Sequence, residues 1–297
     1  MEFRLMAFIS VARNLNFTKA ARELHISQPA VSKHIQELET LLGMQLFERV
    51  GNRVLLTAAG NVCLKYAESI IDSYRRMQLE MNLMSGKFNG ELRLGASTTI
   101  AQYVLPPIIA KFITRFPDVK LSMLTGNSEQ IEQAIDDHKI DVGMVEGSRH
   151  RQGLRYVLFA NDELVMVTST TNRSKDEVSV DELVALPLVL REAGSGTLEV
   201  IENALADHKL SLKQMNILLQ MGATEGIKYF LSNAPSAYAI ISIAALSKEL
   251  MNNTLKVIEI NGLEFCREFS FVLAQGVHNE LTDRFMEFVK AFDNKKL

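Results

Sequence analysis

The pattern of apolar and polar positions changes character twice along the chain. Residues 1–60 contain short stretches in which apolar residues recur every three or four positions, as on helices that bury one face. Residues 58–85 have the pattern of one long helix, and the glycine-flanked segment 86–90 predicts a hinge after it. Beyond Glu91, apolar runs of strand length alternate with helical stretches, which predicts a parallel sheet built from βαβ units.

Three short helices and a β-hairpin are expected within residues 1–60. Thr18 is the expected N-cap of the second helix and Ser27 that of the third, because a hydroxyl oxygen can accept a hydrogen bond from a free backbone N–H. Pro29 suits the first turn of the third helix, where no intrahelical N–H bond is lost. Two apolar-rich segments that meet at Gly51–Asn52 predict the hairpin.

The third helix and the hairpin offer side chains suited to contacting duplex DNA. A helix that is braced by its neighbour can place its N-terminal end in the major groove, where Gln pairs with adenine and Lys donates to guanine or a phosphate. Arginines beside the hairpin tip would reach phosphates or the minor groove. An ordinary solvated surface residue is the alternative at each position. The candidate DNA-binding residues are Thr18, Ser27, Gln28, Pro29, Ser32, Lys33, Arg49 and Arg53.

Charge supports this interpretation only locally. The whole chain has a net charge of -3 at pH 7, which gives no sign of a nucleic-acid partner. Residues 1–60 contain seven basic and five acidic residues, so this segment is mildly basic while the remainder is acidic. Apolar residues make up 47% of the chain and charged residues 23%, a composition typical of a globular protein and not of a disordered one.

Targeting and cysteine signals indicate a cytoplasmic protein. The N-terminus lacks the basic start and apolar run of a signal peptide, and the longest apolar stretch, Ala237–Ala245, is too short to span a bilayer. Cys63 and Cys266 lie far apart in sequence, so neither a disulfide framework nor a zinc site is expected. No cofactor and no metal is expected.

The long helix carries an apolar stripe suited to pairing with a second copy of the chain. The spacings along the stripe are seven, four, three, four and three residues, at Cys63, Ile70, Tyr74, Met77, Met81 and Met84. Such spacing is typical of a two-helix seam. Packing of the helix against the chain's own body is the alternative.

Small polar residues follow several expected strands in the α/β half. In open α/β sheets, ligands bind beyond the carboxyl ends of the strands. Helix N-termini there offer free N–H groups and a partial positive charge, and hydroxyls add donors, so these junctions favour a small anion. An ordinary N-cap is the alternative at each junction. The candidate effector-binding residues are Ser97, Thr98, Thr99, Gly126, Asn127, Ser128, Glu146, Ser195, Gly196, Thr197 and Thr224.

Two charged residues near these junctions favour opposite ligands. Arg191 could supply a cation beside the junction at Ser195, or could be a surface residue. Glu146 would repel an anion, and could instead receive a cationic part of the ligand or control its entry.

A close resemblance to a known family lies in residues 17–60, FTKAARELHISQPAVSKHIQELETLLGMQLFERVGNRVLLTAAG. The segment resembles, in order and without gaps, the winged helix-turn-helix of LysR-type bacterial transcriptional regulators. One departure is Ala58, where family members commonly carry Pro, and this affects where the long helix begins. The resemblance implies a DNA-binding domain over residues 1–60, followed by a linker and dimerisation helix with its hinge over residues 61–90.

The α/β half resembles the family's effector domain, which is similar to a periplasmic binding protein with two α/β subdomains. This resemblance implies an effector-binding domain over residues 91–297, in which subdomain I spans residues 91–161 and 267–297 and subdomain II spans residues 162–266. Two crossover strands, near Phe159–Glu163 and Phe265–Phe269, would join the subdomains.

Two segments, LREAGSGTLEVIENAL and QMGATEGIKYFLSNAPSAYAIIS, narrow the resemblance to one branch of the family. They are similar to segments of regulators of sulfur and carbon-dioxide assimilation, which favours sulfite, sulfate or a small carboxylate as effector. NAPSAYAI departs from the branch's glycine-rich stretch at this place, so Pro235 and Tyr238 are expected to reshape that wall of the site.

Together these features predict a transcriptional regulator that binds double-stranded operator DNA, assembles with itself as a dimer or tetramer, and senses a small molecule. RNA polymerase is a further candidate partner. Ligand binding would close the subdomains and change the placement of the DNA modules. Catalysis is not expected, because the nucleophile-elbow, dinucleotide and P-loop motifs are incomplete and the six histidines show no HExxH spacing. The alternative is a soluble α/β solute-binding or enzymatic protein with an N-terminal protein-interaction module.

Overall fold

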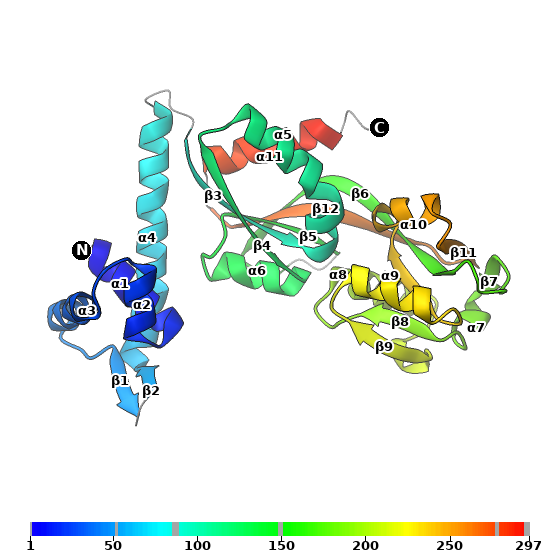
Figure 1. The fold of residues 1–297 in the computed structure, drawn as a ribbon, viewed down its shortest axis with the longest axis horizontal. Coiled ribbons are helices and arrows are strands. Elements are labelled where there is room, and N and C mark those ends of the chain that lie inside the picture. Colours follow the sequence, from blue (N-terminus) through cyan, green and yellow to red (C-terminus); the bar gives the residue numbers. More distant parts are fainter. Residues whose placement is uncertain (1, 51–52, 85–88, 148–150, 277–278, 294–297) are drawn as a thin grey trace. The chain divides into compact units, whose positions relative to one another are not determined.

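The chain folds as two units, Met1–Lys87 and Phe88–Leu297 (Figure 1). The structure is a computed structural model that describes residues 2–50, 53–84, 89–147, 151–276 and 279–293. The hinge expected at residues 86–90 therefore lies mostly outside the described residues.

The first unit is a three-helix module with a hairpin and a long helix. Its elements are α1 (Glu2–Asn14), α2 (Phe17–Glu23), α3 (Gln28–Leu42), β1 (Phe47–Val50), β2 (Arg53–Leu56) and α4 (Ala58–Met84). Helices α1, α2 and α3 surround an apolar core that includes Phe8, Val31, Ile35 and Leu38, all of them buried. The apolar periodicity of the sequence therefore describes the faces that these helices bury.

The starts of α2 and α3 give one correction and one confirmation. Ser27 is the N-cap of α3, as expected, and its side chain accepts the N–H of Ala30 at 3.3 Å. Thr18 does not cap α2. Asn16 does, because the helix already begins at Phe17, and the Asn16 side chain accepts the N–H of Lys19 at 3.0 Å. Asparagine is a somewhat better N-cap than threonine, so the earlier of the two positions prevails.

Helix α4 turns one side toward the three-helix module and leaves a stripe of its other side exposed. Ala67 and Ile71 are buried in the module's core and Cys63 packs partly against it, so Cys63 does not belong to an open seam. The exposed apolar side chains of α4 are Val62, Tyr66, Ile70, Met77 and Met81. The side chain of Met84 lies outside the described part of the chain. The expected pairing stripe is thus uncovered at Ile70, Met77 and Met81.

A ten-stranded mixed sheet organises the second unit (Figure 1). Its main strand order is β4-β3-β5-β12-β6-β10-β8-β9, while β11 pairs with β6 and with β7. The strands are β3 (Gly90–Ser97), β4 (Val119–Gly126), β5 (Val142–Glu146), β6 (Leu154–Ser169), β7 (Glu177–Ser179), β8 (Leu188–Arg191), β9 (Ile217–Met221), β10 (Tyr238–Ser242), β11 (Leu255–Asn261) and β12 (Phe265–Ala274). β3 runs parallel to β4 and β5, and β8 runs parallel to β9 and β10, as the alternation of strands and helices predicted.

Strands β6 and β12 connect the two halves of this sheet. They run antiparallel to each other, and the segments expected to cross over, Phe159–Glu163 and Phe265–Phe269, lie on them. β12 also pairs with β5 in the first half, and β6 also pairs with β10 in the second half. We call β3, β4 and β5 with their helices the first half of the domain, and β8, β9 and β10 with theirs the second half.

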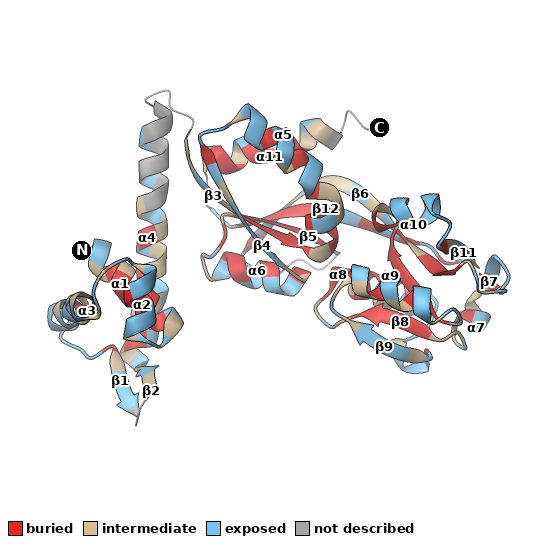
Figure 2. Ribbon diagram, viewed as in Figure 1, coloured by how far each residue is buried: buried red, intermediate tan, exposed pale blue. Residues whose placement is uncertain are grey.

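Helices flank the sheet in both halves (Figure 1). The first half carries η1 (Ile100–Val104), α5 (Leu105–Arg115), α6 (Ser128–Asp136) and α11 (Glu280–Asp293). The second half carries α7 (Val180–Leu183), α8 (Gly196–Asp207), η2 (Leu212–Gln214), α9 (Thr224–Asn233), η3 (Ile243–Ala245) and α10 (Ser247–Met251). Every residue of β5, β8 and β10 is buried (Figure 2), so polar side chains at the carboxyl ends of β5 and β8 are held inside the domain.

Candidate functional site

The N-terminal end of α3 presents polar side chains at the surface of the first unit. The Gln28 amide donates from Nε2 to Ser32 Oγ at 2.8 Å, which aligns the two side chains along the first turns of the helix. Lys33 is exposed beside them, and Thr18 is exposed on α2. The Ser27 hydroxyl serves as the helix cap, so a DNA contact from it would share that oxygen with Ala30.

Strands β1 and β2 form the expected hairpin, with both of its arginines exposed. Arg49 pairs with Val54 in the register, whereas Arg53 pairs with Val50. Successive residues of a strand point to opposite sides, so this register puts Arg49 and Arg53 on opposite faces of the hairpin. The two arginines are therefore placed to reach different parts of a bound partner.

Glu39 fixes the hairpin to α3, a role that the sequence analysis did not identify. Its Oε1 accepts the backbone N–H of Leu46 at 2.7 Å and that of Phe47 at 3.3 Å. The Phe47 ring lies between Phe8 and Phe17, with centroid distances of 5.4 and 5.7 Å. The hairpin and the N-terminal end of α3 are thus held in one arrangement.

In the second unit, a buried carboxylate lies at the centre of a polar cluster. Glu146 ends β5 and is 3% exposed. Its carboxylate accepts hydrogen bonds from the hydroxyls of Ser97 and Thr99, the latter at 3.3 Å, and its backbone carbonyl accepts one from Ser128 Oγ at 2.9 Å. Side chains from the ends of β3 and the start of α6 therefore converge on one acidic residue.

A buried arginine faces the same carboxylate from β12. Arg267 Nε donates to Asp162 Oδ2 at 2.7 Å, and Nη1 donates to Thr197 Oγ1 at 2.8 Å. Nη1 also lies 3.6 Å from Glu146 Oε1. Among the described residues, Nη2 has no hydrogen-bond partner although it is buried. A buried charge needs partners, and this guanidinium finds them in Asp162 on β6 and Thr197 on α8. It therefore links both crossover strands to α8.

The two halves of the domain touch where α8 begins. A Cβ atom added to Gly196 would lie 1.9 Å from the backbone oxygen of Glu146, so only glycine fits there. The backbone N–H of Glu129 donates to the carbonyl of Gly194 at 3.2 Å across the same boundary. The halves are therefore in contact at Gly194 and Gly196.

The structure brings most of the expected effector residues together. The buried cluster contains Ser97, Thr99, Ser128, Glu146, Ser195, Gly196 and Thr197. Thr98 adjoins it in sequence, and its Oγ1 is buried without a hydrogen-bond partner in the described ranges. Ser195 also acts as the N-cap of α8, since its hydroxyl accepts the N–H of Thr197 at 3.2 Å.

The remaining expected residues take other roles. Asn127, which follows Gly126, forms a capping box with Gln130 at the start of α6. Thr224 Oγ1 accepts from Arg191 Nη1 at 3.4 Å. Arg191 is not a surface residue: it is 1% exposed, and its Nε lies 2.9 Å from a carboxylate oxygen of Glu192. Arg267, not Arg191, is the cation next to Glu146.

Arg267 and Asp162 escaped the sequence analysis, although the strand pattern carries a signal for them. Phe265 and Phe269 are the apolar residues that face inward on β12, and Arg267 lies between them with the same parity. A charged residue at an inward position must be paired, which identifies it as a structural or functional charge. Asp162, its cross-strand partner, is the residue that meets this requirement.

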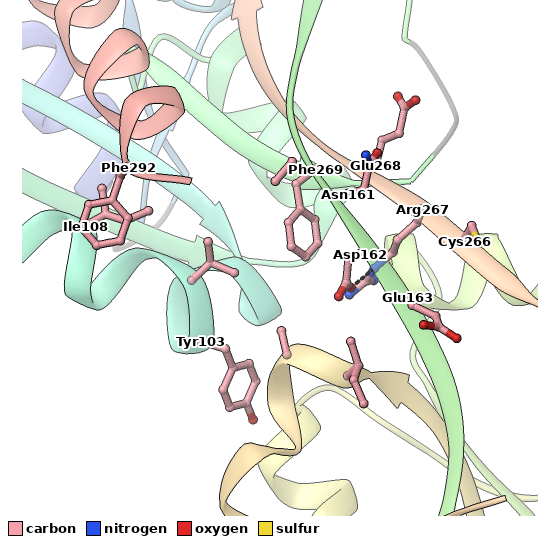
Figure 3. Close-up of a pocket in the computed structure, with 14 residues that line it drawn as sticks. Tyr103, Ile108, Asn161, Asp162, Glu163, Cys266, Arg267, Glu268, Phe269 and Phe292 are labelled. Carbon is pink, nitrogen blue, oxygen red and sulfur yellow. Dashed lines mark hydrogen bonds and ion pairs between the residues drawn. The ribbon is translucent and has the colours of Figure 1, made fainter. Parts of the chain in front are cut away.

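Two cavities border this cluster. One, of about 730 Å³, has an acidic wall that includes Glu129, Glu132, Glu146, Glu199 and Glu202, together with Ser128 and Ser195. The other, of about 810 Å³, borders the Arg267–Asp162 pair and is shown in Figure 3. In the first cavity, burial raises the pKa of the Glu132 carboxyl, while a hydrogen bond from the Tyr156 hydroxyl at 2.8 Å opposes this shift.

Comparisons with known proteins agree with both units. Residues 4–61 match the model of the bacterial regulatory helix-turn-helix proteins of the lysR family, and residues 85–293 match the LysR substrate binding domain. The chain is 30% identical over 254 residues to an uncharacterized HTH-type transcriptional regulator, YeiE, of Escherichia coli (strain K12), covering 85% of this chain and 82% of YeiE. It is 29% identical over 297 residues to a probable RuBisCO transcriptional regulator of Thalassiosira pseudonana, covering 98% and 94% of the two chains. CbnR, solved at full length with its target DNA, shares the fold with a TM-score of 0.68 at 22% identity, covering 98% of this chain and 99% of CbnR.

The first unit combines a winged helix-turn-helix with a long helix, and the second unit is a two-part α/β domain that can hold a ligand. This combination defines a transcription regulator with an effector domain. The chain belongs to the LysR family of such regulators. The fold class expected from the sequence is confirmed, and so is the resemblance to the branch that includes RuBisCO regulators. These relatives are named as regulators and not as enzymes, so the enzymatic alternative is discarded.

Metal and membrane signals are absent from the part of the chain that the structure describes. In those residues, no group of histidine, cysteine and acidic side chains is arranged to hold a metal ion. No helix within them combines the length and the apolar character needed to cross a bilayer.

Proposed function

We propose that this cytoplasmic regulator binds duplex operator DNA as a dimer or tetramer, and that a small anion in the α/β domain modulates the binding. The proposal of an anionic effector rests on the buried carboxylate of Glu146. Hydroxyls of Ser97 and Thr99 already donate to it, and Arg267 faces it at 3.6 Å. A site that holds a carboxylate offers the donors that a free oxyanion needs.

Two buried donors that lack partners among the residues that the structure describes support the proposal, one on the guanidinium that faces Glu146 and one on the residue between Ser97 and Thr99. Thr98 Oγ1 and Arg267 Nη2 are buried and lack hydrogen-bond partners within the described ranges. A buried donor without a partner costs about 1–3 kcal/mol. An oxyanion that accepts from these groups and from the N-terminus of α8 would remove that cost. Sulfite, sulfate or a small carboxylate has the acceptor oxygens to do so.

Glu146 makes anion binding depend on a rearrangement. Two negative charges a few ångströms apart repel each other strongly in a buried site. An incoming anion therefore has to move the Glu146 carboxylate away from its hydroxyl partners. Because Glu146 meets Gly196 of the other half, this movement would alter the contact between the halves and so the placement of the DNA modules.

One observation favours a cationic effector as a second candidate. The cavity of about 730 Å³ has several glutamates on its wall, which would attract an amine or another cation. Arg151, on the same wall, already pairs with Asp136 at 3.1 Å.

A single isosteric change separates the two effector classes. Glu146→Gln keeps the size of the side chain and removes its charge, and Glu264→Gln, an exposed position, is the matched control. Thermal unfolding would be followed with sulfite, sulfate and acetate, and with ethylenediamine as the cationic probe, since a ligand that binds the folded state raises its apparent stability.

For an anionic effector, Glu146→Gln raises the affinity for sulfite or sulfate, and Thr197→Val lowers it. For a cationic effector, Glu146→Gln abolishes the response to ethylenediamine. If no anion stabilises either the wild type or Glu146→Gln, the anion proposal is wrong.

The DNA contacts are tested by the salt dependence of binding. We propose that Lys33 and Arg53 each contact a phosphate or a base edge, with the other candidates on α2, α3 and the hairpin around them. For each phosphate contact removed, the slope of log affinity against log salt should fall by about 0.9. Lys33→Ala and Arg53→Ala should therefore reduce affinity and slope, whereas Lys213→Ala, exposed in the second unit, should change neither. An unchanged affinity in both variants would refute these assignments.

Self-assembly is proposed through the exposed stripe of α4. Pairing of two α4 helices would present two α3 helices to a pseudo-palindromic site. RNA polymerase is proposed as a further partner because the chain is a member of a family of transcriptional regulators.

A further inference from the structure

A cavity of about 810 Å³ lies between the two halves of the α/β domain (Figure 3). Its walls come from η1 and α5 with Tyr103 and Ile108, from α11 with Phe292, and from η3 with Ile243. None of the effector-binding residues expected from the sequence lines it. The volume lies within the range of small-molecule sites, roughly 300–1,000 Å³.

The walls of this cavity are mainly apolar. Rings of Tyr103, Phe269 and Phe292 line it together with Val104, Ile108 and Ile243. Ile243 is 38% exposed, which leaves part of this apolar surface open to solvent. Flat, apolar walls of this kind suit an aromatic or aliphatic body.

The Arg267 guanidinium on the polar side of the cavity is already paired with carboxylates. Arg267 Nε donates to Asp162 Oδ2 at 2.7 Å, and Ser242 Oγ donates to Asp162 Oδ1 at 2.9 Å. Glu146 lies 3.6 Å from the same guanidinium, so two carboxylates face one positive charge. Glu163 and Glu268 also line the cavity, so a further negative charge would be repelled. Arg267 Nη2, without a partner in the described part of the chain, still offers a hydrogen-bond donor.

Both halves of the domain hold this cavity together. Tyr103 belongs to the first half, and its hydroxyl donates to Glu225 Oε1 of α9 in the second half at 2.5 Å. The ammonium of Lys228, also on α9, lies 5.0 Å from the centre of the Tyr103 ring. A molecule in the cavity would therefore contact a wall whose position depends on how the halves are joined.

We propose that this cavity is a second ligand site, which takes an uncharged, mainly apolar molecule with a hydrogen-bond acceptor at one end. The apolar body lies against Tyr103 and Phe269, and the acceptor, such as an amide or ketone oxygen, points toward Arg267. Because Arg267 also contacts Thr197, occupancy of this cavity is coupled to the cluster around Glu146. The proposal does not depend on the charge of the effector that binds at Glu146.

Three probes of similar size test the assignment on the full-length protein. They are phenylacetamide, phenylacetate and phenethylamine, which share a benzyl group and end in a neutral amide, a carboxylate and an ammonium group. Ligand-observed NMR and thermal unfolding would measure binding to the wild type and to Ala244→Trp, which fills the cavity from η3. Ala206→Trp, an exposed position on α8, is the matched control, and Val104→Phe is a second filling variant.

Phenylacetamide is expected to bind saturably to the wild type and to Ala206→Trp, and to lose binding in Ala244→Trp and Val104→Phe. The charged probes are expected to bind at least about tenfold more weakly, because the carboxylates that line the cavity repel phenylacetate and the Arg267 guanidinium repels the ammonium of phenethylamine. Both filling variants should still bind sulfite or sulfate, with an affinity changed only by the coupling between the sites, so a failure of this proposal differs from a failure of the anion proposal.

Three results would overturn the second site. The first is equal binding of phenylacetamide to the wild type and to both filling variants. The second is tighter binding of phenylacetate or phenethylamine than of phenylacetamide. The third is the absence of phenylacetamide binding to the wild type at millimolar concentration.

Discussion

Arg267 and Asp162 form a buried ion pair across the two crossover strands, with Nε 2.7 Å from Oδ2. They are register partners on β12 and β6, where the chain passes from one half of the effector domain to the other. The same guanidinium donates to Thr197 at the start of α8 and faces Glu146 at the end of β5. The connection between the halves and the candidate effector site therefore share one side chain.

Removal of this guanidinium should destabilise the second unit severely. Arg267→Met would leave the buried Asp162 carboxylate without its cation, which costs about 3–5 kcal/mol of unfolding free energy. Arg155→Met, an exposed position on the same β6 strand, is the control and should stay within about 0.5 kcal/mol of the wild type. Urea unfolding of the full-length protein would measure both. A loss below 1 kcal/mol for Arg267→Met would mean that the ion pair does not hold the crossover strands.

Gly196→Ala should separate the two halves of the domain at α8. The added Cβ would lie 1.9 Å from the Glu146 carbonyl oxygen, so backbone has to shift, at about 1–3 kcal/mol. Gly222→Ala is the matched control, because a Cβ there meets nothing within 4 Å. Thermal unfolding and small-angle scattering would report stability and domain opening. Equal stability and equal scattering of Gly196→Ala and Gly222→Ala would show that the contact between Gly196 and Glu146 does not hold the halves together.

Glu39→Ala should weaken DNA binding without removing any residue expected to touch DNA. The change removes the acceptor for the N–H groups of Leu46 and Phe47, at about 1–3 kcal/mol, and loosens the hairpin relative to α3. Glu48→Ala removes an exposed carboxylate from the hairpin itself and is the control. Fluorescence anisotropy with labelled DNA would compare them. Equal affinities for Glu39→Ala and wild type would show that the hydrogen bonds do not position the hairpin.

A charge in the exposed stripe of α4 should disrupt self-assembly. Ile70→Glu places a carboxylate where a second α4 is proposed to pack, and burying it without a partner is unfavourable. Lys65→Glu introduces the same side chain at an exposed position of α4 outside the stripe. Light scattering after gel filtration should show a smaller assembly for Ile70→Glu only. An unchanged mass for Ile70→Glu would exclude this stripe as the pairing surface.

Glu132→Gln should increase stability at neutral and higher pH. Burial raises the pKa of the Glu132 carboxyl in the folded protein, so the folded state binds this proton more tightly than the unfolded state does. The ionised carboxylate therefore costs stability above the folded-state pKa, and this cost disappears as the pH falls below the ordinary carboxyl range. Unfolding midpoints of Glu132→Gln and wild type should thus differ at pH 8 and converge near pH 4. Glu91→Gln, exposed on β3, is the control.

Local signals explain which parts of the fold could be predicted from the sequence. Ser27 followed by Pro29 is a strong start signal, and α3 begins there. The alternation of strands and helices beyond Glu91 predicted the parallel strands in both halves of the sheet, because this alternation is also a signal that lies in neighbouring stretches of sequence. The prediction of Thr18 as the N-cap of α2 was wrong, because Asn16 is also a good capping residue and lies directly before the first residue of the helix.

Long-range pairing explains what could not be predicted. Asp162 lies 105 residues before Arg267, and only the register of β6 with β12 brings them together. The hydroxyls of Ser97 and Thr99 were expected near a ligand, but their contact with the Glu146 carboxylate depends on how β3 and β5 are placed side by side. The opposite faces of Arg49 and Arg53 likewise follow from the hairpin register and not from their spacing.

The central claim is that an anion received beside Glu146 changes how the first unit binds DNA. The direct measurement is the affinity of the full-length protein for genomic fragments that it selects, with and without sulfite or sulfate, for wild type and Thr197→Val. The account predicts that the anion shifts the wild-type affinity by at least about fivefold, a typical coupling between sites, and leaves Thr197→Val nearly unaffected. Selective DNA binding that no anion alters in the wild type would contradict it.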